Sequence, residues 1–391
     1  MEILAHGEIM KVALLIRRFI TTGGAERYAV EVAKRLADQC ELHVFAQEIG
    51  VEPPGIHIHK LRLISEKPRY LNQLHFSMQA AHLQGRFDII HSHERVSVFD
   101  VLTIHCPTFK GGYLGDRMGL RRMQRLMMAG VSPRISFYLR QESGQFRHGP
   151  GRRFIAVSRH VMNDVLSHYP LNENDFHIAY PGVNAEAFHP ANEDQRASAR
   201  KGFGIPHDAL VVGFVGTEFA RKGLGALIEA MGHLRGMPVR LLVAGGGNVA
   251  PFRKKATDLG VAGQITFAGL LTDVTTVYAA SDIYILPTLS DPCPMAPLEA
   301  MACGVPAIIS NERITGVAEH IRNDEAILLK NPRDAVEIAG AIRRLLDPET
   351  RRVYAEWGLS LVQKITWDDT SWRTLEAYKR SIMERSHRIT G

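Results

Sequence analysis

The sequence predicts an α/β protein of two domains, each built on a doubly wound parallel sheet. Short apolar runs alternate with segments of helical periodicity, which is the pattern of parallel βα units. The alternation stops and restarts around residues 182–190. A length of 391 residues suits two domains, at about 100–200 residues per domain. A composition of 45% hydrophobic and 23% charged residues is that of a globular chain and excludes general disorder.

The first half opens with a strand, a loop, a helix and a second strand. The apolar run at 11–16 is followed by a turn at 21–24, a helix at 25–36 and a strand at 41–47. Further strands are expected at 87–92, 101–105 and 154–158, and a further helix at 159–168.

The second half repeats the pattern after the turn at 180–184. Its strands are expected at 210–216, 239–245, 265–269, 283–287 and 307–310, with a helix at 224–234. Two helices around the segment 367–372 are expected to fill 354–384. We therefore predict an N-terminal domain over 1–184, completed by about 368–391, and a C-terminal domain over 185–367. Hinges at 181–183 and at the last helix would let the two domains close on a ligand.

The sequence predicts a cytoplasmic protein. No apolar run approaches the roughly 20 residues that a membrane span needs. Residues 1–10 are neither basic nor strongly apolar, so no signal peptide is expected, and Met10 is an alternative start. The four cysteines lie far apart without a CxxC pair, which argues against a zinc cluster or a disulfide framework.

Two loops that follow strands carry features of anion binding. Gly23 and Gly24 allow close approach of backbone to a ligand, and the helix that begins there favours an anion, although a plain turn is the alternative. The spacing is not that of a dinucleotide fingerprint. In the segment 216–223, Arg221 and Lys222 are placed to hold a pyrophosphate at the carboxyl end of a strand. A solvated loop is the alternative there.

The strongest motif spans residues 290–306. Asp291 and Glu299 stand eight positions apart, with the second acid inside a predicted helix that ends near Gly304. The loop between them would aim backbone N–H groups at a ligand, and Glu299 could accept two hydroxyl groups. Glu299 could instead be an acid that complements the helix dipole.

Other candidates are weaker. His91 and His93 alternate on one strand face beside Glu94, but no third metal ligand is indicated, so metal binding is the minor interpretation. His105 closes a strand and is either structural or part of an acceptor site. The glycines at 245–247 favour a tight turn. No DxD motif is present, so no carboxylate pair for a metal–nucleotide complex is expected.

Taken together, these motifs resemble those of glycosyltransferase family 4, the retaining nucleotide-sugar transferases of GT-B architecture. The glycine loop, the Arg221–Lys222 element and the Asp291…Glu299 element occur in the family's order, the last as its E-x7-E signature. The resemblance implies two Rossmann-like domains with a deep cleft between them and a C-terminal helix that returns to the first. The segment 216–223 and the basic stretch in the first domain are most similar to those of lipopolysaccharide-core glucosyltransferases.

The resemblance also implies roles for individual residues. Arg221 and Lys222 would neutralise the donor diphosphate, and Asp291 would face the donor sugar. Glu299 would hydrogen-bond the ribose, and His105 and Glu26 would contact the acceptor. The remaining donor-binding residues would be Gly23, Gly24, Thr217, Met295, Ala296 and Leu298. No metal and no cofactor are expected.

Three residues depart from the family pattern. Asp291 is one methylene shorter than the usual glutamate, and Pro294 replaces a common glycine and removes a backbone N–H. Tyr28 stands where the core glucosyltransferases place an acid. These departures bear on sugar identity and on the acceptor more than on the reaction.

The expected function is therefore transfer of a hexose, with retention, from a nucleoside diphosphate sugar such as UDP-glucose to a saccharide or glycolipid acceptor such as lipopolysaccharide core, in cell-envelope synthesis. A GT-B-type nucleotide-sugar epimerase and a non-enzymatic nucleotide-sugar-binding protein are the alternatives. A nucleic-acid binder fits poorly, because the cations lack aromatic stacking platforms.

A basic segment at 110–153 suggests a further partner. It holds ten basic and two acidic residues, a net charge of +8 against +6 for the whole chain, interleaved with large apolar side chains. Such a segment suits the surface of an anionic bilayer, which predicts peripheral association with the inner face of the cytoplasmic membrane. The alternative is that the arginines are solvated while the methionines pack in the core.

Overall fold

The computed structural model describes residues 9–115, 119–322 and 325–389. The chain forms two compact units, Met1–Pro181 with Trp367–Gly391, and Gly182–Thr366. The division predicted from the sequence was 1–184 with about 368–391, and 185–367. We call these the first and second units.

The first unit is built on a parallel sheet. Over the described residues it has seven strands, in the order β5-β3-β1-β6-β7-β8-β9. The order reverses at β1, because the chain moves outward from β1 to β5 and then returns to β6 on the other side. Ligands bind such sheets at the carboxyl ends of the strands beside this reversal. The strands are β1 (Lys11–Leu15), β3 (Glu41–Ala46), β5 (Ile56–Lys60), β6 (Ile89–Ser92), β7 (Val101–Ile104), β8 (Arg153–Ala156) and β9 (Phe176–Ile178).

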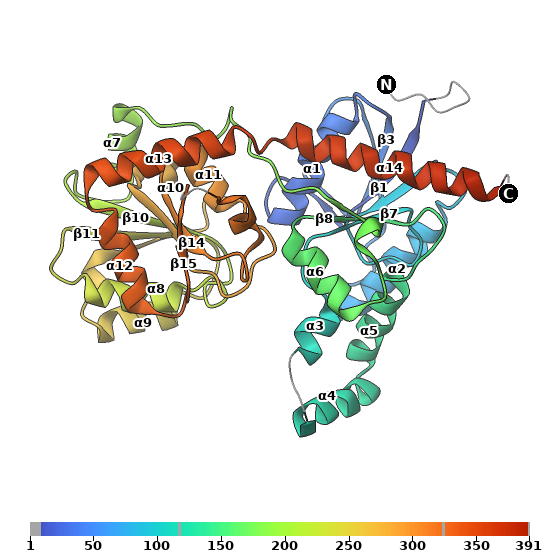
Figure 1. Ribbon diagram of the computed structural model, residues 1–391, viewed down its shortest axis with the longest axis horizontal. Coiled ribbons are helices and arrows are strands. Elements are labelled where there is room, and N and C mark those ends of the chain that lie inside the picture. Colours follow the sequence, from blue (N-terminus) through green and yellow to red (C-terminus); the bar gives the residue numbers. More distant parts are fainter. Residues whose placement is uncertain (1–8, 116–118, 323–324, 390–391) are drawn as a thin grey trace. The chain divides into compact units, whose positions relative to one another are not determined.

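Helices cover both faces of this sheet (Figure 1). They are α1 (Gly24–Leu36), α2 (Arg69–Ala81), α3 (Phe109–Leu114), α4 (Gly119–Val131), α5 (Pro133–Gln145), α6 (Arg159–His168) and α14 (Trp367–Ile389). A small pair, β2 (Arg18–Phe19) and β4 (Glu48–Ile49), extends the loops after β1 and β3.

The helix α14 returns from the end of the chain to the first unit. The Tyr378 hydroxyl lies 2.7 Å from His91 Nδ1 on β6, and the Ser381 hydroxyl donates to the Gly151 carbonyl at 2.6 Å. Arg385 donates to Asp100 at 2.9 Å. These contacts, made across more than 200 residues of sequence, confirm the predicted return of the last helix.

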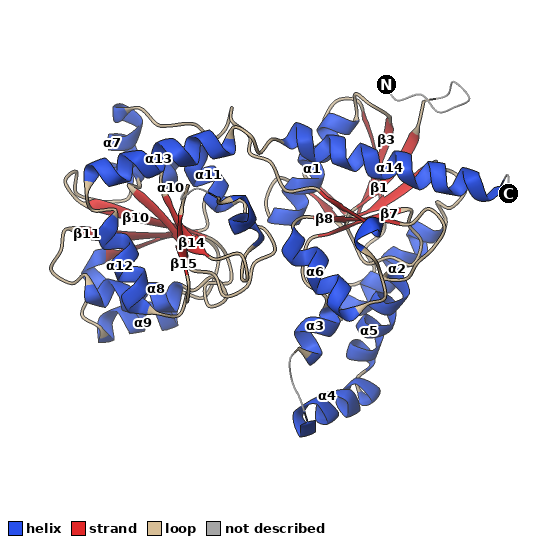
Figure 2. Cartoon of the chain, in the orientation of Figure 1, coloured by secondary structure: helices blue, strands red, loops and turns tan. Residues whose placement is uncertain are grey.

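The second unit repeats the architecture with six strands over the described residues. All are parallel, in the order β12-β11-β10-β13-β14-β15, and Figure 2 shows helices on both sides of them. The order reverses between β10 and β13. The strands are β10 (Leu210–Val215), β11 (Val239–Ala244), β12 (Ile265–Gly269), β13 (Ile283–Leu286), β14 (Ala307–Ser310) and β15 (Ile327–Leu329). The helices are α7 (Glu193–Gly202), α8 (Leu224–His233), α9 (Ala250–Asp258), α10 (Thr275–Ala280), α11 (Ala296–Ala302), α12 (Ala335–Arg344) and α13 (Pro348–Val362).

Alternate residues of each strand in the second unit enter different cores. Val212 and Phe214 of β10 pack in the larger core with α8 and α12, whereas Val211 packs on the other face with Val277 of α10. Burial on both faces explains why these strands are continuous apolar runs, and why the sequence located them well.

The strands predicted for both halves are confirmed, as are the helices over 25–36, 159–168 and 224–234, each within about two residues. The prediction of two helices around 367–372 is wrong in its detail. The break lies at residues 363–366, and Trp367–Trp372 is the start of α14. Thr370 sits inside that helix and donates to the Tyr180 carbonyl at 2.6 Å.

Candidate active site

The carboxyl edge of the second unit's sheet brings two predicted motifs together. The loop after β10 carries Arg221 and Lys222, and the loop after the neighbouring strand β13 carries Asp291. Gly223 between the first loop and α8 has a φ of 81°, and a Cβ there would lie 1.8 Å from the Pro287 carbonyl oxygen. Only glycine permits this close contact. Gly223 therefore allows the loop after β10 to pack directly against the loop after β13.

Hydrogen bonds join the two loops. The Leu289 amide donates to the Arg221 carbonyl at 2.8 Å, and Arg221 Nη1 donates to the Ser290 carbonyl at 2.6 Å. The Lys222 ammonium forms an ion pair with Asp291, and Arg221 Nη1 lies 3.8 Å from the same carboxylate oxygen. The structure thus brings together the three residues predicted to be catalytic.

A backbone hydrogen bond fixes the position of Asp291. Asp291 is buried, and its amide donates to the Ile314 carbonyl at 3.0 Å in a bridge beside Thr315. Glu218 adds a second acid at this edge, 2.6 Å from Arg221 Nη2. The Lys222 side chain is largely buried whereas those of Arg221 and Glu218 are open to solvent, so the Lys222–Asp291 pair is less screened by water.

Glu299 lies in the first turn of α11 and is buried. Its carboxylate accepts a hydrogen bond from the Tyr278 hydroxyl of α10 at 2.8 Å. Met295 caps α11, Ala296 begins it and Leu298 is buried in its first turn. Thr217 is exposed in the loop after β10. The donor-binding residues predicted for this unit therefore lie in the loops or the helix that follow β10 and β13.

The glycine loop of the first unit follows β1. Gly23 is the N-cap of α1 with a φ of 97°, and Gly24 is the first helical residue. A Cβ on Gly23 would lie 2.3 Å from Glu26 Oε2, so the Glu26 carboxylate folds back over the start of the helix. Its other oxygen lies 3.8 Å from Arg18 Nη1. A carboxylate in this place already complements the helix dipole.

The histidines at the carboxyl edge of the first unit form a cluster. His93 Nδ1 lies 2.8 Å from His105 Nε2, and His91 contacts Tyr378 and Thr103 at 2.7 Å each. His91 has both ring nitrogens hydrogen-bonded, which weakens the metal interpretation. His105, which the sequence presented as a lone histidine, is thus a partner of His93.

Burial keeps this histidine cluster neutral. Desolvation lowers the pKa of His91 and of His105 to about 3, and that of His93 well below its ordinary value. Tyr28 closes the cluster: its ring packs edge-on against His105 and Trp367, and its hydroxyl donates to the Ala179 carbonyl at 3.0 Å. Tyr28 is therefore buried in the packing of the unit, where the resemblance would place an acid.

The glycines at 245–247 belong to a tight turn. Gly245 has a φ of 137°, and a Cβ there would lie 1.7 Å from the Gly216 carbonyl oxygen. The turn allows the loops after β11 and β10 to approach closely, in agreement with the interpretation favoured from the sequence.

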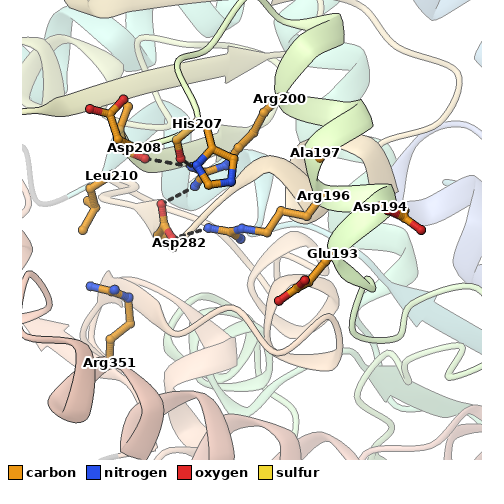
Figure 3. Close-up of a pocket in the computed structure, with 11 residues that line it drawn as sticks. Glu193, Asp194, Arg196, Ala197, Arg200, His207, Asp208, Leu210, Asp282 and Arg351 are labelled. Atoms are coloured by element: carbon orange, nitrogen blue, oxygen red, sulfur yellow. Dashed lines mark hydrogen bonds and ion pairs between the residues drawn. The ribbon is translucent and has the colours of Figure 1, made fainter.

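A pocket of about 720 Å³ lies at the opposite, amino edge of the second unit's sheet (Figure 3). Arg196 and Arg200 both contact Asp282, which directly precedes β13. Arg200 also donates to the carbonyls of His207 and Ala209 at 2.6 and 3.0 Å. These groups satisfy one another and attach α7 to the sheet, which is a structural role.

Three residues of the site were not found from the sequence. Glu218 pairs with Arg221, Tyr278 orients Glu299, and the Ser290 carbonyl positions the Arg221 guanidinium. The spacing of three residues between Glu218 and Arg221 was a possible signal. Tyr278 lies 21 positions before Glu299, and no local pattern marks such a pair.

Comparison with known proteins agrees with this geometry. Residues 22–187 match the family described as Glycosyltransferase Family 4, and residues 195–358 match the family described as Glycosyl transferases group 1. A D-inositol 3-phosphate glycosyltransferase of Stackebrandtia nassauensis is 26% identical, over 93% of this chain and 88% of that protein.

Solved structures share the fold. WaaG, a glycosyltransferase involved in lipopolysaccharide biosynthesis, has a TM-score of 0.78 at 21% identity, over 94% of this chain and 98% of that one. Anabaena Alr3699/HepE in complex with UDP-glucose has a TM-score of 0.72 at 17% identity, over 94% and 98% of the two chains.

The two Rossmann-like units and the charged carboxyl edge define a glycosyl-transferring enzyme of GT-B architecture. The chain belongs to the glycosyltransferases, with a family 4 first unit and a group 1 second unit, and is a hexosyltransferase. Within the described part of the chain, no helix combines the length and the apolar character needed to cross a membrane.

Proposed function

We propose that the enzyme transfers a hexose, with retention of configuration, from UDP-glucose or a similar nucleoside diphosphate sugar to a glycolipid acceptor such as lipopolysaccharide core. The observation that carries this proposal is the Arg221, Lys222 and Asp291 cluster beside the strand reversal of the second unit. Two cations face the place where a nucleotide binds in such sheets, and a buried acid, Glu299, lies one helix turn into α11.

The residues supply the charge that this transfer needs. As the glycosidic bond to the donor breaks, negative charge grows on the leaving diphosphate. Lys222 and Arg221 stabilise that charge, and the loop contacts fix their positions before the reaction begins. Asp291 faces the sugar, and the leaving phosphate helps to deprotonate the acceptor hydroxyl in a front-face attack. No metal enters this chemistry.

The donor is proposed on two grounds. Glu299 is suited to accept the paired hydroxyls of a ribose, because a buried carboxylate is a strong acceptor. The similarity to Alr3699/HepE, which was solved with UDP-glucose, favours a uridine nucleotide and glucose.

The neutral histidine cluster supports an uncharged hydroxyl acceptor. His93 Nε2 is buried and has no hydrogen-bond partner among the residues that the structure describes, and its other nitrogen contacts His105. Glu26 in the first turn of α1 adds a carboxylate acceptor at the carboxyl edge of the same sheet, beside Arg18. An inositol phosphate is the second candidate acceptor, because relatives of this chain are D-inositol 3-phosphate glycosyltransferases.

The surface of α4 favours a glycolipid acceptor over an inositol phosphate. Figure 1 shows α4 projecting from the rest of the first unit beyond α3 and α5. The large apolar side chains of α4 are exposed. The alternative interpretation, in which the methionines of this segment pack in the core, is therefore wrong for α4. The exposed side chains are Leu120, Met123, Leu126, Met127, Met128 and Val131.

The two faces of α4 differ. Leu120, Met123, Met127 and Val131 follow one another at spacings of three and four, so they share one face. Ala129 is the buried residue of this helix, and it shares its face with Arg122 and Arg125 rather than with that apolar stripe. Arg125 stacks on the Tyr113 ring at 4.9 Å. The apolar stripe thus points away from the side on which Ala129 is buried, and Arg122 and Arg125 flank that buried side while remaining exposed.

An anionic bilayer fits this arrangement. The apolar face enters the acyl region and the arginines reach the headgroups, each contributing about 1 kcal/mol near such a surface. Not all of the basic segment takes part: Arg153 is buried and Lys110 donates to the His168 carbonyl. Asp116, Arg117 and Met118 lie outside the described residues. We propose peripheral binding at the cytoplasmic face of the membrane.

The activity is tested by a thermal-shift panel of UDP-, GDP- and ADP-sugars, followed by product analysis with and without acceptor. We expect stabilisation by UDP-glucose, a product only when lipopolysaccharide core is present, and a retained anomeric configuration by NMR. Turnover of the donor to another sugar without acceptor would identify an epimerase. Transfer to inositol phosphate and not to core would replace the proposed acceptor.

Membrane binding is tested by flotation with neutral and anionic vesicles at low and high salt. Arg121→Glu with Arg122→Glu, and Met123→Ser with Met127→Ser, should each abolish flotation with anionic vesicles. Arg352→Glu, at an exposed position of α13 in the second unit, is a charge-reversal control of half that size and should float normally. Binding that ignores lipid charge, or that survives both double changes, would contradict the proposal.

A further inference from the structure

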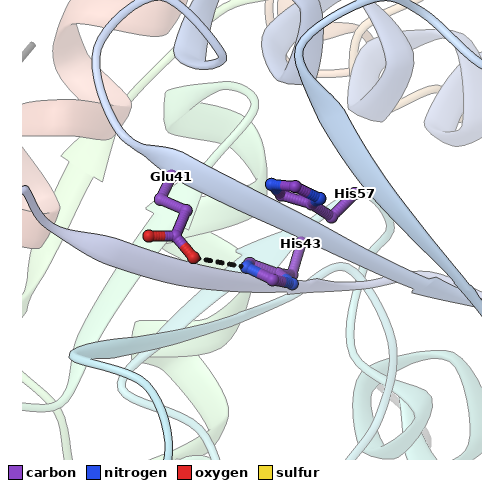
Figure 4. A group of neighbouring side chains, drawn as sticks. All are labelled: Glu41, His43 and His57. Carbon is purple, nitrogen blue, oxygen red and sulfur yellow. Dashed lines mark hydrogen bonds and ion pairs between the residues drawn. The ribbon is translucent and has the colours of Figure 1, made fainter.

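Three side chains with metal-ligating atoms converge on the two outer strands of the first unit's sheet (Figure 4). Glu41 and His43 stand two residues apart on β3 and therefore point to the same face. His57 on the edge strand β5 is in direct register with His43. The ligand atoms of the three residues all lie within 4.8 Å of one another.

Both ring nitrogens of His43 have partners, as those of His91 do, but the partner of His43 Nε2 is a carboxylate that can itself ligate a metal ion. His43 Nε2 lies 3.0 Å from Glu41 Oε1, and its Nδ1 lies 2.9 Å from His59 Nε2. Metal-ligating histidines commonly use one nitrogen for the ion and donate the other N–H to a fixed acceptor, which sets the tautomer. His59 can be that acceptor for His43, leaving Nε2 for an ion shared with Glu41.

The site is open and can contract. His57 is exposed, and the side chains of His43 and Glu41 are partly exposed. Tetrahedral ligands at Zn–N distances near 2.0–2.1 Å lie about 3.4 Å apart. The ligand atoms, which lie within 4.8 Å of one another, must therefore move closer, mainly by rotation of His57 and Glu41, because the His43 ring packs against His59 and Phe87. The rings of His43 and His57 are stacked with centroids 4.5 Å apart, so the exposed His57 ring must turn for both lone pairs to reach one ion.

A nearby cation occupies only one side of the carboxylate. Lys11 Nζ lies 3.5 Å from Glu41 Oε2, whereas Oε1 faces His43. A concave surface of about 520 Å³, lined in part by Lys11, Glu41 and Arg86, opens beside the cluster. Lys11 weakens the attraction for a cation but does not cover the ligand atoms.

We propose that Glu41, His43 and His57 bind one divalent transition-metal ion, with Zn²⁺ as the best fit. Two imidazoles and one carboxylate, with water in the fourth position, are ligands that Zn²⁺ accepts and that Mg²⁺ and Ca²⁺ do not prefer. The site lies near the amino ends of β3 and β5, away from the carboxyl edge where the histidine cluster lies. Its role is structural: the ion joins the edge strand β5 to β3.

The proposal is tested by calorimetric titration of the untagged, metal-free full-length chain with ZnCl₂, and by visible absorption after adding Co²⁺. We expect one ion per chain with micromolar affinity, Co²⁺ bands of a four-coordinate site, and no heat with MgCl₂. His57→Ala, a change at an exposed position, should weaken Zn²⁺ at least tenfold, and Lys11→Ala should tighten it.

A control variant separates this site from general histidine binding. His148→Ala removes an exposed histidine of the first unit that lies outside the cluster, and it should leave the titration unchanged. Zn²⁺ should also raise the melting temperature of the wild type and of His148→Ala but not of His57→Ala. Millimolar affinity, or a titration that His43→Ala and His57→Ala both leave unchanged, would overturn the proposal.

Discussion

The two units share a topology but differ in the chemistry at their carboxyl edges. In both, the strand order reverses beside the first strand, and loops after two neighbouring strands carry the candidate residues. At the edge of the second unit, Arg221, Lys222 and Asp291 are charged and joined by ion pairs. At the edge of the first unit, His93 and His105 are held neutral by burial.

The difference shows that the fold provides the place and the loops provide the chemistry. A charged edge suits a diphosphate, whose charge increases as it leaves. Neutral histidines suit sugar hydroxyls, which need hydrogen-bond partners and no counter-ion, and the charged groups at this edge, such as Arg17 and Glu94, are paired with each other. We propose on this ground that the donor binds at the second unit's edge and the acceptor at the first unit's edge, two sheets whose strand orders are alike.

The largest expected effect separates the two edges kinetically. Lys222→Ala removes charge stabilisation that matters most in the transition state, so kcat at saturating donor should fall by a factor on the order of 10²–10³. Lys254→Ala, which removes an exposed lysine paired with Asp258 on α9, should leave kcat unchanged. Near-normal turnover of Lys222→Ala, in a variant whose thermal melt shows a folded protein, would contradict the catalytic role of the charged edge.

His105→Gln makes the same test on the other edge. Because His105 lies in the first unit, the variant should have a higher KM for the acceptor and an unchanged affinity for the nucleotide. An equal loss of nucleotide affinity in this variant would mean that the division of roles by charge is incorrect.

The second effect is on stability and depends on pH. The pKa of His91 is about 3 in the folded chain, below its ordinary value, so the unfolded chain binds more protons as the pH falls below about 6.5. The folded state therefore loses about 1.4 kcal/mol per pH unit per such histidine, or about 2 kcal/mol each at pH 5. Calorimetric scans at pH 7 and pH 5 measure the loss.

His91→Gln tests the cause of that loss. The amide can still contact Tyr378 or Thr103 but does not titrate. The variant should be less stable at pH 7 and should show a shallower decline toward pH 5. An unchanged slope would place the pH dependence in other groups, first in His105, whose pKa is lowered to about 3, and then in His177, whose pKa is lowered to about 4.

Most of the fold followed from the sequence because both sheets are buried on both faces, which makes their central strands apolar runs. The strands that escaped prediction are short or lie at the edges. β5 alternates isoleucine with exposed histidine, and β9 and β15 have three residues each. Their formation depends on a neighbouring strand that is distant in sequence, which local periodicity does not reveal.

The candidate site was predicted where the motif is local. Arg221 and Lys222 are adjacent, and Asp291 and Glu299 share one loop and helix, so spacing was enough to suggest them. The contacts that position them are not local: Tyr278 reaches Glu299 across 21 residues, and Tyr378 reaches His91 across 287. Such pairs are fixed by tertiary packing, so no sequence window contains them.

The third effect distinguishes binding from catalysis within the charged edge. Glu299→Gln keeps an oxygen for the Tyr278 hydroxyl but weakens the acceptance of ribose hydroxyls in substrate and transition state alike. The donor KM should rise about tenfold with kcat nearly unchanged. Tyr278→Phe, which removes only the orienting hydroxyl, should give a smaller rise. A fall in the kcat of Glu299→Gln comparable to that of Lys222→Ala would mean that Glu299 acts in catalysis and not only in binding.

The smallest effect concerns the balance of charge at the same edge. Glu218 and Asp291 together offset Arg221 and Lys222, so a diphosphate competes with two carboxylates for two cations. Glu218→Gln keeps the shape of the side chain but frees Arg221 from an exposed pair worth about 0.2–1 kcal/mol. The affinity for UDP should therefore rise by a factor of about 1.4 to 5 at low ionic strength, and the gain should shrink at about 0.5 M salt as screening weakens the charges. Calorimetric titration with UDP at both ionic strengths measures it. A loss of affinity would mean that Glu218 positions the Arg221 guanidinium for the phosphate, and the charged edge would then depend on its acids for geometry as well as for charge.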